Sequence, residues 1–279
     1  MARSGWAFVM HRRGHRVGGR RVGAAVVVRT PRAFTLLELL VSVAIVAVLL
    51  GLVVPGLAMS MKSARGFRCQ MSLRSVAFDF TVFADDTLHG DRGDDAALGN
   101  RFRLSTFQES QYGIDEFWRW EGEETHTVPD ESRYDPMRCS EVKGPLTLRR
   151  DLPCGKPGAI SPSEHVSFGF NSRLHRAEVV SGDGKVKAVY VMLTQDILSQ
   201  TDVPLAWDVD GALAAQKGVE PVFSAPSLDS QGPYAGDAYW FPGLRHNGSA
   251  NFAFMDGRVE SSRRPLDEDG WRWGYQPIR

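Results

Sequence analysis

The feature that most constrains the fold is an apolar stretch near the N-terminus, which reads FTLLELLVSVAIVAVLLGLVVPGLA over residues 34–58. From Leu39 to Ala58 the only polar side chain is that of Ser42. A helix rises about 1.5 Å per residue, so Phe34 to Leu57 reaches roughly 36 Å and can cross a hydrocarbon core about 30 Å thick. The sequence therefore predicts a membrane-spanning helix over residues 34–58.

Charge is distributed unevenly on the two sides of this stretch. Residues 1–33 contain eight arginines and no acidic residue, and because the whole chain is neutral, residues 34–279 carry an excess of eight acidic groups. Positively charged flanks remain in the cytoplasm, so we expect a cytoplasmic N-terminus, a single pass through the inner membrane and a periplasmic body. The acidic body argues against nucleic acid as a partner, since phosphate binding requires clustered lysine and arginine.

Two simpler interpretations of the stretch are a cleaved signal peptide and a plain membrane anchor. Gly56-Leu57-Ala58 has the small residues of a signal-peptidase site. The apolar core before it, however, is longer than the roughly 7–15 residues of a signal peptide. A plain anchor leaves Glu38 unexplained, because an ionisable group costs about 2.5–3.5 kcal/mol near the centre of a membrane helix and less toward its edge. Glu38 is therefore expected to have a function.

The segment from Phe34 to Pro55 resembles the N-terminus of type IV pilins and of the pseudopilins of type II secretion systems. In that family a prepilin peptidase cuts on the cytoplasmic side, just before a phenylalanine, and methylates the new amine, while the apolar helix is retained. The resemblance implies cleavage between Ala33 and Phe34, with residues 1–33 as a basic leader peptide. This chain departs from the family at one position, since the family normally has glycine where Ala33 stands.

The same resemblance gives Glu38 and Pro55 roles in assembly. Glu38 becomes the fifth residue of the mature chain, and in the family this carboxylate pairs with the Phe amine of a neighbouring subunit. A carboxylate in a low-dielectric environment is tolerated when a cation meets it. Pro55 falls where helices of the family commonly kink, because proline removes one backbone hydrogen bond. The implied partners are prepilin peptidase, other pilin-like subunits and the inner membrane.

Beyond the membrane the helix is expected to continue over residues 59–86. Apolar side chains recur there at spacings of three and four residues and mark one buried face; they are Leu73, Val76, Ala77, Phe80 and Phe83. Residues 87–279 are expected to form a β-rich head, with predicted strands at 164–171, 185–193 and 203–207 and no long helices between them. The predicted fold class is α+β: a pilin-like long N-terminal helix packed on an antiparallel sheet.

Near the C-terminus, His246 is followed by nine residues and then by Asp256-Gly257. This spacing resembles the processing-associated H-x9-DG domain of pseudopilin-like proteins. The alternation over residues 250–255 predicts a β-hairpin with a two-residue turn at Asp256-Gly257. His246 lies at the far end of that strand from Asp256. We therefore interpret His246 as a loop anchor and Asp256 as a turn residue, with a calcium-ligand role for Asp256 and a catalytic pair as the alternatives.

The chain has three cysteines, Cys69, Cys139 and Cys154, and no CxxC pair, which argues against a thiolate zinc site. In an oxidising compartment Cys139 and Cys154 can close a loop of about 15 residues, worth on the order of 3 kcal/mol, and leave Cys69 unpaired. Three free thiols are the alternative. No cofactor is expected, and no metal site apart from the calcium alternative at Asp256.

Three functional interpretations follow from these features. The first is a structural, non-enzymatic, pseudopilin-like subunit of a type II secretion or type IV pilus-like apparatus. The second is a membrane-tethered binding module for a glycan or an exported substrate, which would use Trp271 and Trp273 as an exposed strip. The alternative, which we favour for these two rings, is that they pack over the sheet. The third is a membrane-anchored enzyme, and it rests only on scattered histidines and aspartates, because the sequence has no nucleophile elbow and no phosphate-binding glycine loop.

Overall fold

The computed structural model describes residues 34–89, 99–111, 125–128, 138–149, 158, 160–180, 182, 186–228 and 234–276. The predicted leader, including Ala33, lies outside the described residues, as does Cys154. The chain divides into two compact units, Met1–Val53 and Val54–Arg279.

One long helix, α1 (Leu36–Ala84), spans 49 residues and has parts in both units. In the first unit all of its side chains are exposed, and they are apolar apart from Glu38 and Ser42. By length and composition this helix can cross a membrane, as the sequence predicted. Pro55 lies inside α1, which continues past it to Ala84.

In the second unit α1 buries one face. The five predicted apolar positions are all fully buried, which confirms that face. Phe80 packs edge-on against Phe107 with ring centroids 5.0 Å apart, and Phe83 packs edge-on against Phe102 at 5.2 Å. Phe78, on the opposite side of the helix, is 63% exposed. The period of 3.6 residues thus separates a head-facing side of α1 from an exposed side.

Short elements complete the head. The helices after α1 are α2 (Asp86–His89), α3 (Leu104–Gln111) and α4 (Gly211–Gln216), and the 3-10 helices are η2 (Ser163–His165), η3 (Ser172–Leu174), η4 (Gln195–Ser199) and η5 (Ala235–Asp237). A small sheet contains β1 (Thr125–Val128), β2 (Leu146–Arg149) and β3 (Ile160–Ser161), and a separate hairpin contains β5 (Arg176–Val180) and β6 (Val186–Tyr190).

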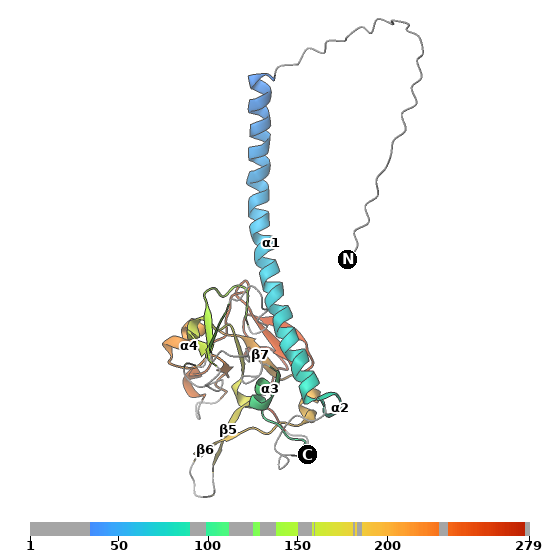
Figure 1. The fold of residues 1–279 in the computed structure, drawn as a ribbon, viewed down its shortest axis with the longest axis vertical. Coiled ribbons are helices and arrows are strands. Elements are labelled where there is room, and N and C mark those ends of the chain that lie inside the picture. Colours follow the sequence, from blue (N-terminus) through green and yellow to red (C-terminus); the bar gives the residue numbers. More distant parts are fainter. Residues whose placement is uncertain are drawn as a thin grey trace, which may run out of the picture. The chain divides into compact units, whose positions relative to one another are not determined.

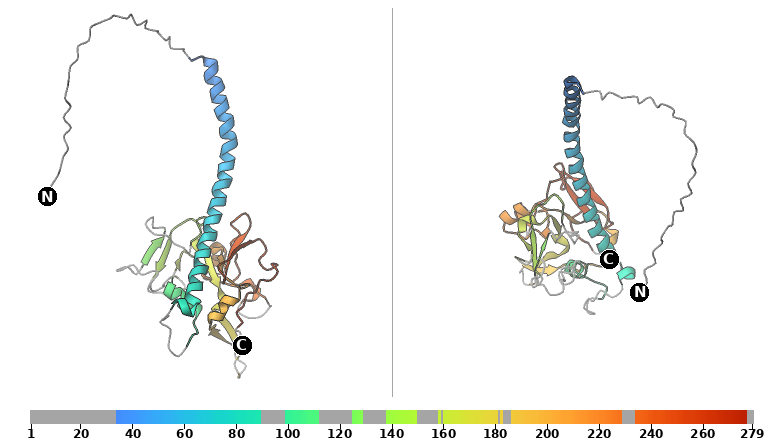
Figure 2. Two further views of the ribbon diagram at one scale, coloured as in Figure 1. Left: turned by 90° about the vertical axis from the view of Figure 1, so that its right-hand side faces the viewer. Right: turned by 45° about the horizontal axis from the view of Figure 1, so that its top comes forward.

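The main sheet has five strands in the order β10-β9-β7-β4-β8. They are β4 (Phe168–Asn171), β7 (Pro204–Asp208), β8 (Phe223–Ser224), β9 (Ala250–Phe254) and β10 (Val259–Ser262). Neighbouring strands are antiparallel except β4 and β8, which are parallel. The last part of α1, which carries its buried residues from Cys69 to Ala84, runs alongside the strands of the head (Figure 1), as two further views also show (Figure 2). The α+β class is confirmed, and the sheet is mixed rather than purely antiparallel.

Strand β9 is buried on both faces. Ala253 packs in a cluster with the buried face of α1, whereas Phe252 and Phe254 pack in a second cluster around Trp207. Successive side chains of a strand point to opposite faces, so the alternation predicted for residues 250–255 separates these two cores. The sheet therefore lies between α1 on one face and an aromatic core on the other.

The predicted strands are found with shifted boundaries. β6 lies within the predicted 185–193 segment, and β7 matches 203–207 to within a residue at each end. The prediction for 164–171 was wrong in its first half, because η2 forms there and β4 begins only at Phe168. This 3-10 turn starts after Pro162, whose carbonyl oxygen accepts a hydrogen bond from His165 N at 3.0 Å.

The turn between β9 and β10 has three residues rather than the predicted two. Gly257 N donates to Phe254 O at 3.1 Å, and Phe254 N donates to Arg258 O at 2.9 Å, so the loop is Met255-Asp256-Gly257. Gly257 has a φ of +81°, as expected for a type I turn followed by a left-handed residue. The prediction of a two-residue turn was wrong, because a glycine with positive φ is typical of both two-residue and three-residue hairpin loops.

Replacing Gly257 with alanine is expected to lower the free energy of unfolding by about 1–2 kcal/mol, since an L-residue is strained in the left-handed region. An added Cβ would meet no atom within 4 Å, so the cost is conformational rather than steric. Gly274 has the same open surroundings without a positive φ, and Gly274→Ala should change stability by less than about 0.5 kcal/mol. Urea unfolding of the full chain in detergent measures both, and equal effects would contradict this assignment.

Candidate functional site

The first candidate site is the N-terminal end of α1. Thr35 and Glu38 form a capping box, in which Glu38 N donates to Thr35 Oγ1 at 3.2 Å and Thr35 N donates to Glu38 Oε2 at 2.9 Å. The Thr35 hydroxyl donates to the same Oε2 at 2.9 Å. Unpaired N–H groups of the first helical turn also favour a negative charge at this position. The carboxylate that is anomalous in an apolar segment therefore closes the first turn of the helix.

Phe34 directly precedes this capping box, and its side chain is 76% exposed. A cut before Phe34 creates a new amine at that residue. The next residue, Thr35, donates its backbone N–H to the Glu38 carboxylate. In the described part of the chain the contacts of the Glu38 carboxylate use Oε2, which leaves Oε1 for another donor. The start of α1 thus brings the predicted cleavage residue next to the predicted assembly carboxylate.

The second candidate site lies in the head, where a disulfide joins Cys69 to Cys139 with their Cα atoms 4.9 Å apart. Both cysteines are fully buried. The predicted Cys139–Cys154 bridge is wrong, and so is the alternative of three free thiols. Cys69 stands four residues before Leu73 on the buried face of α1, so packing of that face carries its sulfur to Cys139.

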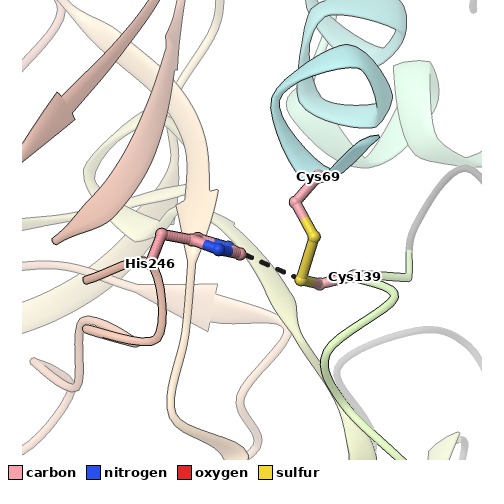
Figure 3. Close-up of side chains that lie close together, drawn as sticks. All are labelled: Cys69, Cys139 and His246. Atoms are coloured by element: carbon pink, nitrogen blue, oxygen red, sulfur yellow. Dashed lines mark hydrogen bonds between the residues drawn. A yellow bond between two sulfur atoms is a disulfide. The ribbon is translucent and has the colours of Figure 1, made fainter. Parts of the chain in front are cut away.

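His246 approaches this disulfide from a loop that precedes β9. Asn247 and Gly248 have φ of +58° and +81° and form a two-residue turn, in which His246 and Ser249 exchange backbone hydrogen bonds of 3.1 Å each. The imidazole points inward, its side chain is 8% exposed, and Nε2 lies 3.6 Å from Cys139 Sγ (Figure 3). The histidine of the H-x9-DG spacing therefore lies against the covalent link between α1 and the head.

Asp208, at the end of β7, is the acidic centre of the same cluster. Its side chain is fully buried, and Oδ2 accepts hydrogen bonds from Asn251 N at 2.8 Å and from Asn251 Nδ2 at 2.9 Å. Oδ1 accepts from an Arg245 guanidinium nitrogen at 3.1 Å, and His246 Nε2 lies 3.3 Å from Oδ2. Sequence reasoning missed this group, because Asp208 is far from the His246 motif along the chain.

Asn251 connects the cluster to α1. Its Oδ1 accepts hydrogen bonds from Ser261 Oγ at 2.6 Å and from Gln70 Nε2 at 3.2 Å. Gln70 is the neighbour of Cys69 in α1, so a covalent link and a hydrogen-bond link join the same turn of the helix to the head.

Asp256 is not brought together with His246. Its Oδ1 accepts a hydrogen bond from Arg258 N at 3.0 Å, its Oδ2 lies 3.5 Å from Arg258 Nε, and its side chain is 32% exposed. Among the residues that the structure describes, the group that could hold a metal ion consists of Cys69, Cys139 and His246, without Asp256. Asp256 therefore acts in this structure as a turn residue.

Trp271 and Trp273 pack against the sheet, which confirms the favoured alternative, and the interpretation of the two rings as an exposed strip is wrong. Trp273 is 6% exposed, and its ring lies edge-on to Trp207 at 5.4 Å and to Trp240 at 5.2 Å. Trp271 is half-buried, with its ring centroid 4.9 Å from that of Phe252. These rings complete the aromatic core beneath the sheet, so the binding-module hypothesis loses the surface on which it was based.

The start of α1 lies within a recognised sequence motif. Residues 29–54 match the prokaryotic N-terminal methylation motif. No curated protein and no solved structure matches the chain. The matched segment contains Ala33, Phe34 and Glu38, and therefore the whole capping box. The chain thus carries a prepilin-type methylation motif, which indicates a pilin-like substrate of prepilin peptidase.

Proposed function

We propose that the protein is a pseudopilin-like structural subunit of a type II secretion or type IV pilus-like apparatus. Prepilin peptidase removes residues 1–33 and methylates the amine of Phe34. The mature chain then joins other pilin-like subunits through the apolar part of α1. Its N-terminus begins on the cytoplasmic side of the inner membrane, its head lies in the periplasm, and it has no catalytic role of its own.

The observation that carries this proposal is the Glu38 carboxylate at the start of an apolar helix, inside the methylation motif. An isolated carboxylate is disfavoured in hydrocarbon, and a cation within contact distance offsets that cost. Cleavage supplies such a cation as the new amine of Phe34. Within one chain Glu38 Oε2 already accepts two hydrogen bonds from Thr35. Oε1 is therefore the atom that accepts a hydrogen bond from the amine of an adjacent subunit.

The head supports the same function through its attachment to α1. A subunit in an assembly must transmit load between its membrane helix and its folded head. The Cys69–Cys139 disulfide and the Gln70–Asn251 hydrogen bond join the helix to the head at two neighbouring residues. Disulfides persist in oxidising compartments, which agrees with a periplasmic head. The spacing from His246 to Gly257 supports a head of the H-x9-DG kind.

Substitution of Glu38 by alanine tests the proposal in cells that carry prepilin peptidase. We expect normal membrane insertion and the same mature N-terminus. Subunit cross-linking and filament incorporation should fall by more than about tenfold, because breaking a low-dielectric ion pair costs about 3–5 kcal/mol. Ser42→Ala, four residues along the same helix, is the matched control and should assemble normally. Mass spectrometry of the N-terminus, with cross-linking of assembled subunits, measures both steps.

Three results would contradict the proposal. One is a native chain that retains residues 1–33, and another is a chain that begins at Met59, as a signal peptide cut after Ala58 would give. The third is a Glu38→Ala variant that assembles as well as the unaltered chain.

A further inference from the structure

We propose that Cys69, Cys139 and His246 bind Zn²⁺ when the disulfide is reduced. The ligand atoms of the two cysteines and the histidine all lie within 4.8 Å of one another, and water can complete a tetrahedral centre that has three protein ligands. The absence of a CxxC pair does not exclude such a site, because the three residues come from separate segments of the chain that the fold brings together. This inference does not depend on the proposed role in assembly.

The distance from His246 Nε2 to Cys139 Sγ matches that in a tetrahedral zinc centre. Zinc bonds of about 2.3 Å to sulfur and about 2.0–2.1 Å to nitrogen place a nitrogen ligand about 3.5 Å from a sulfur ligand. Nε2 lies 3.6 Å from Cys139 Sγ. A structural disulfide requires no imidazole beside it, whereas a metal requires a ligand in addition to the two sulfurs.

The three ligands lie away from solvent. Cys69 and Cys139 are fully buried and the His246 side chain is 8% exposed. When Nε2 binds a metal, the proton of the neutral imidazole is on Nδ1. Among the described residues that atom is buried without a hydrogen-bond partner, and Glu141 Oε1 lies 4.0 Å from it. A metal-bound histidine commonly donates its second ring N–H to a carboxylate, and an approach of about 1 Å would bring Glu141 into hydrogen-bond distance for that role.

The disulfide and the metal site are alternative states of the same residues. A dithiol reductant gives two electrons and two protons to the Cys69–Cys139 bond, which breaks into two thiols while the reductant becomes a disulfide. Zinc binding then displaces both thiol protons, and the sulfurs separate to about 3.8 Å. The metal replaces the disulfide as the link between α1 and the head, so reduction does not release the helix.

Cobalt titration of the reduced full chain in detergent tests this proposal. After reduction with a phosphine, Co²⁺ should bind one per chain and produce thiolate-to-metal charge-transfer and tetrahedral ligand-field bands, and Zn²⁺ should displace it. The oxidised chain should show neither band. Zinc should also raise the thermal unfolding temperature of the reduced chain relative to the chelated sample, which measures binding without a spectroscopic metal.

Matched variants identify the ligands. Cys69→Ser and Cys139→Ser should remove the charge-transfer band or reduce its intensity by half. His246→Gln should weaken cobalt binding at least tenfold, and Cys154→Ser should bind as the unaltered chain does. Near-ultraviolet circular dichroism of oxidised His246→Gln shows whether its head is folded. The proposal is overturned if the reduced unaltered chain gives no charge-transfer band, if Cys69→Ser keeps the band at full intensity, or if Cys154→Ser loses it.

Discussion

Replacing Cys69 with serine lowers the free energy of unfolding of the oxidised, metal-free head by about 4 kcal/mol, because the lost bridge closes a loop of about 70 residues in the unfolded chain. The sequence separation of the two cysteines is 70. A longer closed loop removes more entropy from the unfolded state, so the effect exceeds the roughly 3 kcal/mol of the shorter bridge predicted from the sequence. Urea unfolding followed by tryptophan fluorescence measures the loss, since Trp207, Trp240 and Trp273 contact one another in the head core.

Two controls separate the bridge from the general effect of removing a sulfur atom. Cys154→Ser should leave the unfolding midpoint of the oxidised chain unchanged. The free energy of unfolding of the double variant, with serine at residues 69 and 139, should lie within about 0.5 kcal/mol of that of either single variant. Both changes remove the same bond, so their effects do not add. A strongly destabilised Cys154→Ser chain, with an unaffected Cys69→Ser chain, would contradict the observed pairing.

The pairing shows what the sequence can and cannot predict about the head. The spacing of Leu73, Val76 and Phe80 correctly predicts the buried face of α1, because helical periodicity is a local property. Cysteine pairing is not local: spacing alone favours Cys139 and Cys154, since short loops close at low entropic cost. The folded state instead selects the partner that packing places within reach. Cys69 continues the apolar face by one turn, and this was the signal available in the sequence.

The same reasoning applies to the polar cluster. The spacing of His246 and Asp256 suggests a relation between them, but a strand of about 3.3 Å per residue separates the two. The partner of His246 is Asp208, which the sheet order brings beside β9 through the β7–β9 pairing. Strand order depends on the whole chain, so sequence reasoning could identify the motif and the strand ending in Asp208 without connecting them.

Replacing Asp208 with asparagine is expected to lower the free energy of unfolding of the oxidised head by about 3 kcal/mol, because removing one member of a buried charge pair leaves the other without compensation. The shape of the side chain is kept, but its negative charge is lost opposite Arg245, and one of its acceptor oxygens becomes a donor. That NH₂ group then faces the N–H donors of Arg245 or Asn251, and those donors lose their acceptor.

Asp210→Asn is the matched control, two residues further along the same segment. Asp210 Oδ1 accepts a hydrogen bond from Leu213 N at 3.0 Å and caps α4. Asparagine caps a helix about as well as aspartate, so this change should cost less than about 0.5 kcal/mol. Unfolding curves of the two variants therefore distinguish a buried charge at the centre of the His246 cluster from a half-buried helix cap. Equal curves would mean that the buried charge of Asp208 adds no more to the stability of the head than the cap of α4 does.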